Sequence, residues 1–328
     1  MIGIFKQRSS GNAFILLLYA LILKFPLFLH PVSFLESKDS NYIYQLISGL
    51  VAPLAARAPL VLSIIAFLLY FTQATLLNRI ANTLKLLPRG NFLVGMAYLL
   101  VSSMFRDWNS FSAALVINSL MIWIWYRMIG LYNNGNPKTA IYNVGLMVGL
   151  LPLIYTPSAI LVVLLAIALV VTRPPNIAEW LVALLGLMTP YYFLFVYLFL
   201  NDKWANDIFI PSIQFQRPQL GSTIWLISAV VFLATLFVTG GLYVQSNLNK
   251  MLIQVRKAWG LMLFFLISFF LLLLVYPATN YLHWMLMIIP VAAFHAAAYF
   301  YIPKKWIASI LHWIGFVFAI LLNYGLLK

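Results

Sequence analysis

Long apolar stretches separated by short polar segments dominate the pattern of this chain. Eleven stretches can be marked, at residues 13–34, 58–77, 91–105, 111–131, 140–155, 158–172, 177–200, 223–245, 260–277, 281–302 and 306–326. A helix that crosses a bilayer needs roughly 20 apolar residues. The pattern therefore predicts an all-α, polytopic helical membrane protein with about 11 transmembrane helices, in a single integral membrane domain over residues 1–328.

One of these stretches is too short for a regular crossing. The apolar run from 144 to 155 would give about 18 Å of helix, against roughly 30 Å of hydrocarbon. Pro152 and Pro157 force a turn there, because proline lacks a backbone donor and restricts the residue before it. We expect one short hairpin near 144–172, which either borders a cavity or consists of ordinary short paired helices.

Two smaller features concern helix packing. Gly145 and Gly149 have the GxxxG spacing that lets a neighbouring helix approach closely. His295 lies among small residues, and no acidic residue falls within a predicted span to serve as its partner in a proton relay. We interpret it as a hydrogen-bonded structural histidine.

Composition supports a membrane location and excludes several kinds of chemistry. Of the 328 residues, 64% are hydrophobic and 8% are charged, and the mean hydropathy is +0.98. One soluble core could not bury that much apolar surface. The longest segments between apolar runs, 35–57 and 201–222, are too short to fold as separate domains. The chain has no cysteine, which excludes disulfides, thiolate metal sites and thiol nucleophiles.

Charge predicts the orientation of the chain. The 20 Lys and Arg residues exceed the 6 Asp and Glu residues, for a formal charge of +14. If the N-terminus is inside, the inner loops carry 13 cations and one acid, Glu179, and the outer loops carry six cations and five acids. The inner cations are Lys6, Arg8, Arg79, Lys85, Arg89, Arg127, Lys138, Arg173, Lys250, Arg256, Lys257, Lys304 and Lys305.

The positive-inside rule then predicts a cytoplasmic N-terminus, an outside C-terminus and a multi-pass protein of the cell (inner) membrane. We interpret the basic inner face as an anchor for membrane lipids with anionic headgroups, and expect no nucleic-acid partner.

The predicted outer loops contain the candidate catalytic residues. Glu36 and Asp39 lie three residues apart and would share one face of a helical turn. A carboxylate at this boundary could act as a general base, and its neighbour could bind a divalent cation. The following segment, 43–50, is amphipathic and is expected along the outer interface. The alternative is that both acids are solvated loop residues.

Candidate substrate-binding residues are Lys24, Arg57, Arg106, Asp107 and Trp108. Arginine forks match phosphate oxygens, and an aromatic face can cover a sugar. Lys24 is the one cation inside a predicted span, where a charge is a functional hypothesis by default. The alternatives are that the outer loops are simply electroneutral and that Lys24 reaches an interface by snorkelling. No metal-ligand spacing is found among the histidines.

Several stretches resemble an uncharacterised family of polytopic bacterial inner-membrane proteins. They are residues 4–6, 12–14, 143–158, 173–180, 186–192 and 254–259. More distantly, the middle stretch is similar to C-type, lipid-phosphosugar-dependent glycosyltransferases. In those enzymes a glycine-bearing helix, a proline turn, an arginine and a helix ending in proline recur. This second resemblance implies a polyprenyl-phosphate-linked substrate and an acidic catalytic residue in the first outer loop, where Glu36 and Asp39 lie.

Three classes of function stay open. The first is a glycosyltransferase-like enzyme of the bacterial cell envelope that acts on a lipid-linked substrate at the outer face. The second is a non-catalytic membrane subunit of an envelope secretion or assembly complex, which would bind other envelope proteins. The third is a transporter or flippase, although the chain shows no internal repeat and no intramembrane acid.

Overall fold

The computed structural model describes residues 1–7, 9, 11–31, 40–203, 224–275 and 281–326. These residues are helical throughout, apart from turns and one isolated bridge between Ser40 and Tyr155. The α-helices are α1 (Ile2–Phe5), α2 (Gly11–Lys24), α3 (Pro26–Leu29), α4 (Tyr42–Arg57), α5 (Pro59–Thr83), α6 (Leu93–Val101), α7 (Ala113–Ile129), α8 (Lys138–Leu150), α9 (Leu161–Thr172), α10 (Ile177–Leu200), α11 (Ile224–Asn247), α12 (Ile253–Val275), α13 (Ile288–Tyr301) and α14 (Lys305–Asn323). The 3₁₀ turns are η1 (Arg106–Trp108), η2 (Leu151–Leu153), η3 (Thr156–Ile160), η5 (Leu248–Lys250) and η6 (Tyr281–Met287).

The protein is an all-helical, multi-pass membrane protein. Among the described residues, six helices are long and apolar enough to cross a membrane: Pro59–Thr83, Ile177–Leu200, Ile224–Lys250, Ile253–Leu272, Leu282–Tyr301 and Lys305–Asn323. A helix also occurs in each of the other predicted runs, but these helices are shorter. The expected number of 11 crossings is therefore not confirmed. Prolines account for part of the shortening, because Pro26 starts a new short helix and Pro152 and Pro157 lie in 3₁₀ turns.

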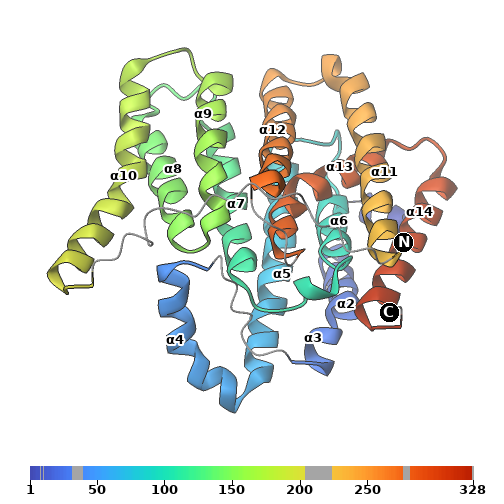
Figure 1. Ribbon diagram of the computed structural model, residues 1–328. Coiled ribbons are helices and arrows are strands. Elements are labelled where there is room, and N and C mark those ends of the chain that lie inside the picture. The colour runs from blue at the N-terminus through green and yellow to red at the C-terminus, as the bar shows by residue number, and fades with distance from the viewer. Residues whose placement is uncertain (8, 10, 32–39, 204–223, 276–280, 327–328) are drawn as a thin grey trace.

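Five of the predicted inner cations, Lys85, Arg89, Arg173, Lys250 and Lys304, lie in turns at one end of the bundle. Lys6 Nζ donates to the carbonyl oxygen of Phe300 at 3.2 Å, and Lys257 Nζ donates to that of Val171 at 2.6 Å. In Figure 1 the turns from α9 to α10 and from α11 to α12 are at the top of the view, and α3 and α4 are at the bottom. We call this end the basic end. It comprises residues 84–92, 130–137, 173–176, 248–252 and 302–304.

Short helices run from the basic end into the bundle and stop inside it. The helix α6 has nine residues, about 14 Å at 1.5 Å per residue, so it covers about half of a bilayer core. Beyond α6, between α8 and α9, and before α13 the chain forms η1, η2, η3 and η6, which we call the turn layer. Non-helical backbone inside a membrane bundle is tolerated only where protein or a cavity surrounds it.

The hairpin expected near 144–172 is present as α8, the turns η2 and η3, and α9. Its helix α8 lies against α10, and glycine makes the contact possible on both sides. A Cβ atom added to Gly145 would lie 2.6 Å from the carbonyl oxygen of Ala183, and one added to Gly186 would lie 2.5 Å from that of Tyr142. The GxxxG packing prediction is therefore confirmed.

The helices α11 and α13 pack equally closely, since a Cβ atom at Gly240 would overlap the backbone of Phe294. His295, next to this contact, is fully buried. Its Nε2 lies 2.9 Å from the carbonyl oxygen of Leu233, to which it donates. The prediction of a hydrogen-bonded structural histidine is confirmed.

Candidate functional site

The helix α2 ends at Lys24, just before Pro26, and its last side chain is fully buried. Lys24 Nζ donates to the carbonyl oxygen of Ser102 at 2.7 Å and to Asn109 Oδ1 at 3.0 Å. It also lies 3.8 Å from the ring centroid of Tyr70, a cation–π contact. Because Lys24 has no exposed surface, the alternative that it snorkels to an interface is wrong.

Further hydrogen bonds connect these residues to one another and to α14. Asn109 Nδ2 donates to Asn323 Oδ1 at 2.6 Å, and Asn323 Nδ2 donates to the carbonyl oxygen of Leu23 at 3.2 Å. The hydroxyl of Tyr70 donates to the carbonyl oxygen of Trp108. The network therefore fixes the ends of α2 and α14 against α5 and η1.

Neutral groups hold the Lys24 charge. In the described part of the chain the one ion pair is Arg173–Glu179, so no described carboxylate pairs with Lys24. Ser102 is the C-cap of α6, where the orphan carbonyl groups carry partial negative charge. An ammonium has three donors, and here two meet oxygen atoms and the third meets an aromatic face. A phosphate would have to displace one of these partners to reach Lys24.

The remaining predicted substrate-binding residues lie at different depths. Trp108 is buried, with its ring centroid 4.4 Å from that of Phe105. Arg106 and Asp107 precede it in η1 and are exposed. Arg57 lies at the exposed end of α4, and no described hydrogen bond or ion pair joins it to the others. The structure thus brings Lys24 and Trp108 together through Tyr70, but not Arg57.

The predicted catalytic residues, Glu36 and Asp39, lie outside the described residues. The next two residues in the sequence are anchored on the turn layer. Ser40 pairs with Tyr155 in an antiparallel bridge. The backbone N–H of Asn41 donates to the carbonyl oxygen of Ile154 at 3.0 Å.

Sequence reasoning missed one polar pair beside this anchor. The hydroxyl oxygen of Tyr155 lies 2.6 Å from His283 Nδ1, in a hydrogen bond that joins the residue before η3 to η6. The two residues are 128 positions apart in the chain. The proline turn at Thr156 and Pro157 marked the place of Tyr155, but no spacing pointed to His283. A tyrosine hydroxyl and a histidine ring in contact can pass one proton between them.

An apolar cavity of about 450 Å³ lies between α11, α12 and the turn layer. All of its lining side chains are apolar or aromatic, and they include Phe105, Trp108, Phe237, Phe270 and Trp284. Its volume is within the range of pockets that hold small molecules. An apolar lining of this kind suits a hydrocarbon chain.

No group of three His, Asp or Glu side chains that could hold a metal occurs among the residues that the structure describes. Glu36 and Asp39, the residues predicted to bind a divalent cation, do not belong to the described residues.

Comparison with known proteins gives one match. No curated protein and no solved structure matches the chain. The family described as a family of unknown function, DUF6427, matches residues 15–327, from α2 to the end of α14 and beyond. Since the match covers nearly the whole sequence, the chain belongs to the DUF6427 family.

Proposed function

We propose that this protein binds a lipid-linked substrate, with the hydrocarbon chain in the apolar cavity and the polar head at the turn layer. The observation that carries the proposal is that Trp108 and Trp284 both line the cavity and both belong to the turn layer. Tryptophan is favoured where one end of a site is apolar and the other polar. The cavity therefore ends at a boundary suited to an amphiphile.

The positive-inside rule supports a cytoplasmic basic end, which would place the turn layer toward the outer face of the inner membrane. Arg106 is exposed in η1, beside the buried Trp108. It is a candidate to bind a phosphate at the mouth of the site, since its guanidinium can make two parallel hydrogen bonds to phosphate oxygens. Lys24 acts behind it by holding α6, η1 and α14 together.

In the more specific form of this proposal, the protein is a glycosyltransferase-like enzyme whose catalytic residues lie in the first outer loop. In it, a polyprenyl-phosphate-linked sugar is the donor, and Glu36 or Asp39 is the base or the ligand of a divalent cation. Support comes from the anchor at Ser40 and Asn41, which ties the segment after Asp39 to the turn layer.

A non-catalytic membrane subunit is the second candidate. The observation that favours it is that Lys24 is already occupied by two hydrogen bonds and a cation–π contact, which leave this cation no donor for a substrate. The double variant Glu36→Gln and Asp39→Asn separates the two. An enzyme that depends on these carboxylates should lose complementation of a deletion phenotype at normal protein level, since general-base contributions are about 100- to 10,000-fold. Full complementation favours the subunit.

The lipid-binding proposal is tested by filling the cavity. Ala234→Phe adds a ring to the cavity wall on α11, and Val238→Phe adds the same ring to an exposed position on that helix. Both variants are placed in nanodiscs that contain polyprenyl phosphate, and bound lipid is counted by native mass spectrometry. We expect Ala234→Phe to lose most of the bound polyprenyl phosphate and Val238→Phe to retain it. Equal retention by both variants would reject the cavity as the lipid site.

A further inference from the structure

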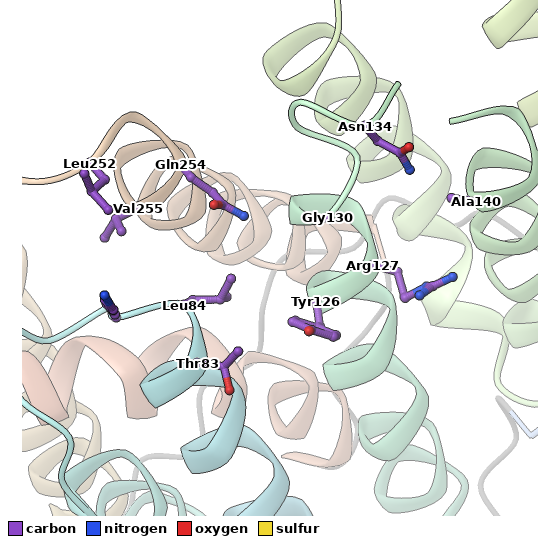
Figure 2. A pocket seen from close by; sticks show the side chains of 11 residues that line it. Thr83, Leu84, Tyr126, Arg127, Gly130, Asn134, Ala140, Leu252, Gln254 and Val255 are labelled. Atoms are coloured by element: carbon purple, nitrogen blue, oxygen red, sulfur yellow. The ribbon is translucent and has the colours of Figure 1, made fainter. Parts of the chain in front are cut away.

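A second pocket, of about 440 Å³, opens at the basic end, far from the turn layer. Figure 2 shows its walls: Thr83 comes from the end of α5, Tyr126 from α7, and Gln254 from the start of α12. The side chains of Tyr126 and Gln254 lie across the open space from each other. Unlike the apolar cavity, this pocket has polar or charged lining residues at the ends of α5, α7 and α12.

Thr83 and Asn134 form hydrogen bonds within the fold, but the other polar lining side chains form none with the described part of the chain. Lys85 and Arg127 line the pocket and are exposed, and neither makes an ion pair within the described chain. Arg127 has one described contact, with its guanidinium carbon 5.5 Å from the ring centroid of Trp123. No side-chain hydrogen bond is shown for Lys85, Tyr126 or Gln254 among the described residues. Two cations and two neutral donors are thus available to a ligand.

The backbone at Lys85 is an unusual place for a lysine. Its φ is +56°, the N–H of Lys85 donates to the carbonyl oxygen of Asn82 at 3.2 Å, and that of Leu86 donates to Ala81 at 2.9 Å. This is a Schellman cap, whose left-handed position is usually glycine. A lysine here costs conformational energy that glycine would avoid. A function of the Lys85 side chain in the pocket would explain why lysine, and not glycine, occupies this position.

Nearby negative charge is already neutralised. Glu179 is the one described carboxylate at this end, and it accepts hydrogen bonds from Arg173 Nη2 at 2.8 Å and Nε at 3.1 Å. The same pair raises the pKa of Arg173, chiefly through the hydrogen bond to Glu179. Arg173 also donates to the carbonyl oxygen of Asn134, a lining residue, at 2.8 Å. The pocket therefore keeps a net positive charge.

The start of α12 adds to this potential. Gln254 and Val255 belong to its first turn, where backbone N–H groups have no partner within the helix. The N-terminal end of a helix carries partial positive charge and favours anions. Lys85, Arg127 and this helix end come from three different elements and meet at one cavity.

We propose that this pocket binds a phosphate group, through Lys85, Arg127, Tyr126 and Gln254. A phosphate matches both the lysine point charge and the arginine fork. The pocket extends well beyond one phosphate, so the ligand carries a further polar group. The phosphate belongs either to the headgroup of an anionic lipid at this face or to a soluble phosphorylated molecule.

The full chain in nanodiscs distinguishes these sources. One arm uses discs with phosphatidylglycerol in phosphatidylcholine, and counts bound phosphatidylglycerol by native mass spectrometry. The other arm uses discs of phosphatidylcholine alone and titrates inorganic pyrophosphate by calorimetry. Binding in the first arm alone assigns a lipid headgroup, and binding in the second assigns a soluble ligand; either result supports the site if the variants below weaken it.

The informative variants are Lys85→Gly and Arg127→Gln, with Lys138→Gln as the matched control. Lys138 begins α8 at the same end, but it does not line the pocket. Lys85→Gly deletes the charge and suits the backbone, so the protein should unfold at an equal or higher temperature. We expect each pocket variant to weaken binding by about tenfold or more, as for a charge-assisted hydrogen bond, and the control by less than about twofold. Wild-type binding by Lys85→Gly, or no binding in either arm, would overturn the proposal.

Discussion

Lys24 shows how a single charge can be accommodated in an apolar bundle without a counter-ion. Burial of an unpaired ammonium is costly, and the protein offsets this cost with two oxygen acceptors and the face of Tyr70. One acceptor is the carbonyl oxygen of Ser102, at the negative end of α6. The lysine therefore caps a helix that stops inside the bundle. The same hydrogen bond gives the buried ammonium an acceptor and gives the C-cap carbonyl group of α6 a donor.

The first prediction at this scale is that Lys24→Met lowers stability. The change leaves the Ser102 carbonyl and Asn109 Oδ1 without their donor, at about 1–3 kcal/mol for each unsatisfied buried group. Deletion of a central intramembrane charge acts in the opposite direction, by about 2.5–3.5 kcal/mol on the insertion scale. We expect the lost contacts to prevail, because all three donors are used in the folded state. Thermal unfolding in nanodiscs measures the outcome.

Lys305→Met is the matched control for that measurement, since Lys305 is exposed at the start of α14. It should leave the unfolding midpoint within about 1 °C, as expected for a surface charge. If Lys24→Met is as stable as wild type, the ammonium is not a structural cap, and a role in ligand binding becomes the better explanation for a buried lysine at this position.

At the scale of residues, the sequence could identify candidates but not their partners. Lys24 stands out because it is charged within an apolar run, and Trp108 because it follows Arg106 and Asp107. Asn109 and Asn323 carry no such signal, and they meet although 214 positions separate them. Asparagine in a polar turn is ordinary, so its burial in the Lys24 network follows only from the three-dimensional arrangement.

At the scale of elements, the apolar pattern predicted where helices occur better than how far they extend. The helix α10 has the predicted bounds, Ile177–Leu200. The run 91–105, in contrast, contains a helix of nine residues followed by η1. Apolar composition indicates only that a segment prefers a lipid-like interior. A short helix with a buried turn can have the same apolar composition as a long helix. The sequence therefore predicted the turn layer only at Pro152 and Pro157.

The second prediction concerns the contact between α8 and α10. Gly145→Ala places a methyl group 2.6 Å from the carbonyl oxygen of Ala183, so the helices must separate. Gly241→Ala is the control, because a Cβ atom there meets nothing within 4 Å. We expect the first variant to lower the unfolding midpoint, and the second to leave it equal or raise it, since alanine favours helix by about 1 kcal/mol over glycine. Equal midpoints would show that α8 and α10 tolerate a wider spacing.

At the scale of the whole molecule, the two ends of the bundle differ in chemistry. The basic end has a charged pocket, and the opposite half has the apolar cavity and the turn layer. The helix α12 reaches both, with Gln254 at one and Phe270 at the other. These residues are 16 positions apart, about 24 Å along a helix. One rigid element therefore connects the two proposed binding sites.

The last prediction is the orientation of the whole bundle. The side chain of Trp259 donates to the carbonyl oxygen of Leu86 at 3.3 Å, so the turns near Leu87 and Arg256 lie at the same end. Reporter fusions after Leu87 and after Arg256 must therefore agree with each other, and positive charge predicts that both report the cytoplasm. Fusions after Phe105 and after Asn201 should report the outside. If all four fusions report the opposite side, the fold is unaffected but its orientation is reversed. The pocket at the basic end then faces the envelope, and the ligand of each proposed site must be sought on the other side of the membrane.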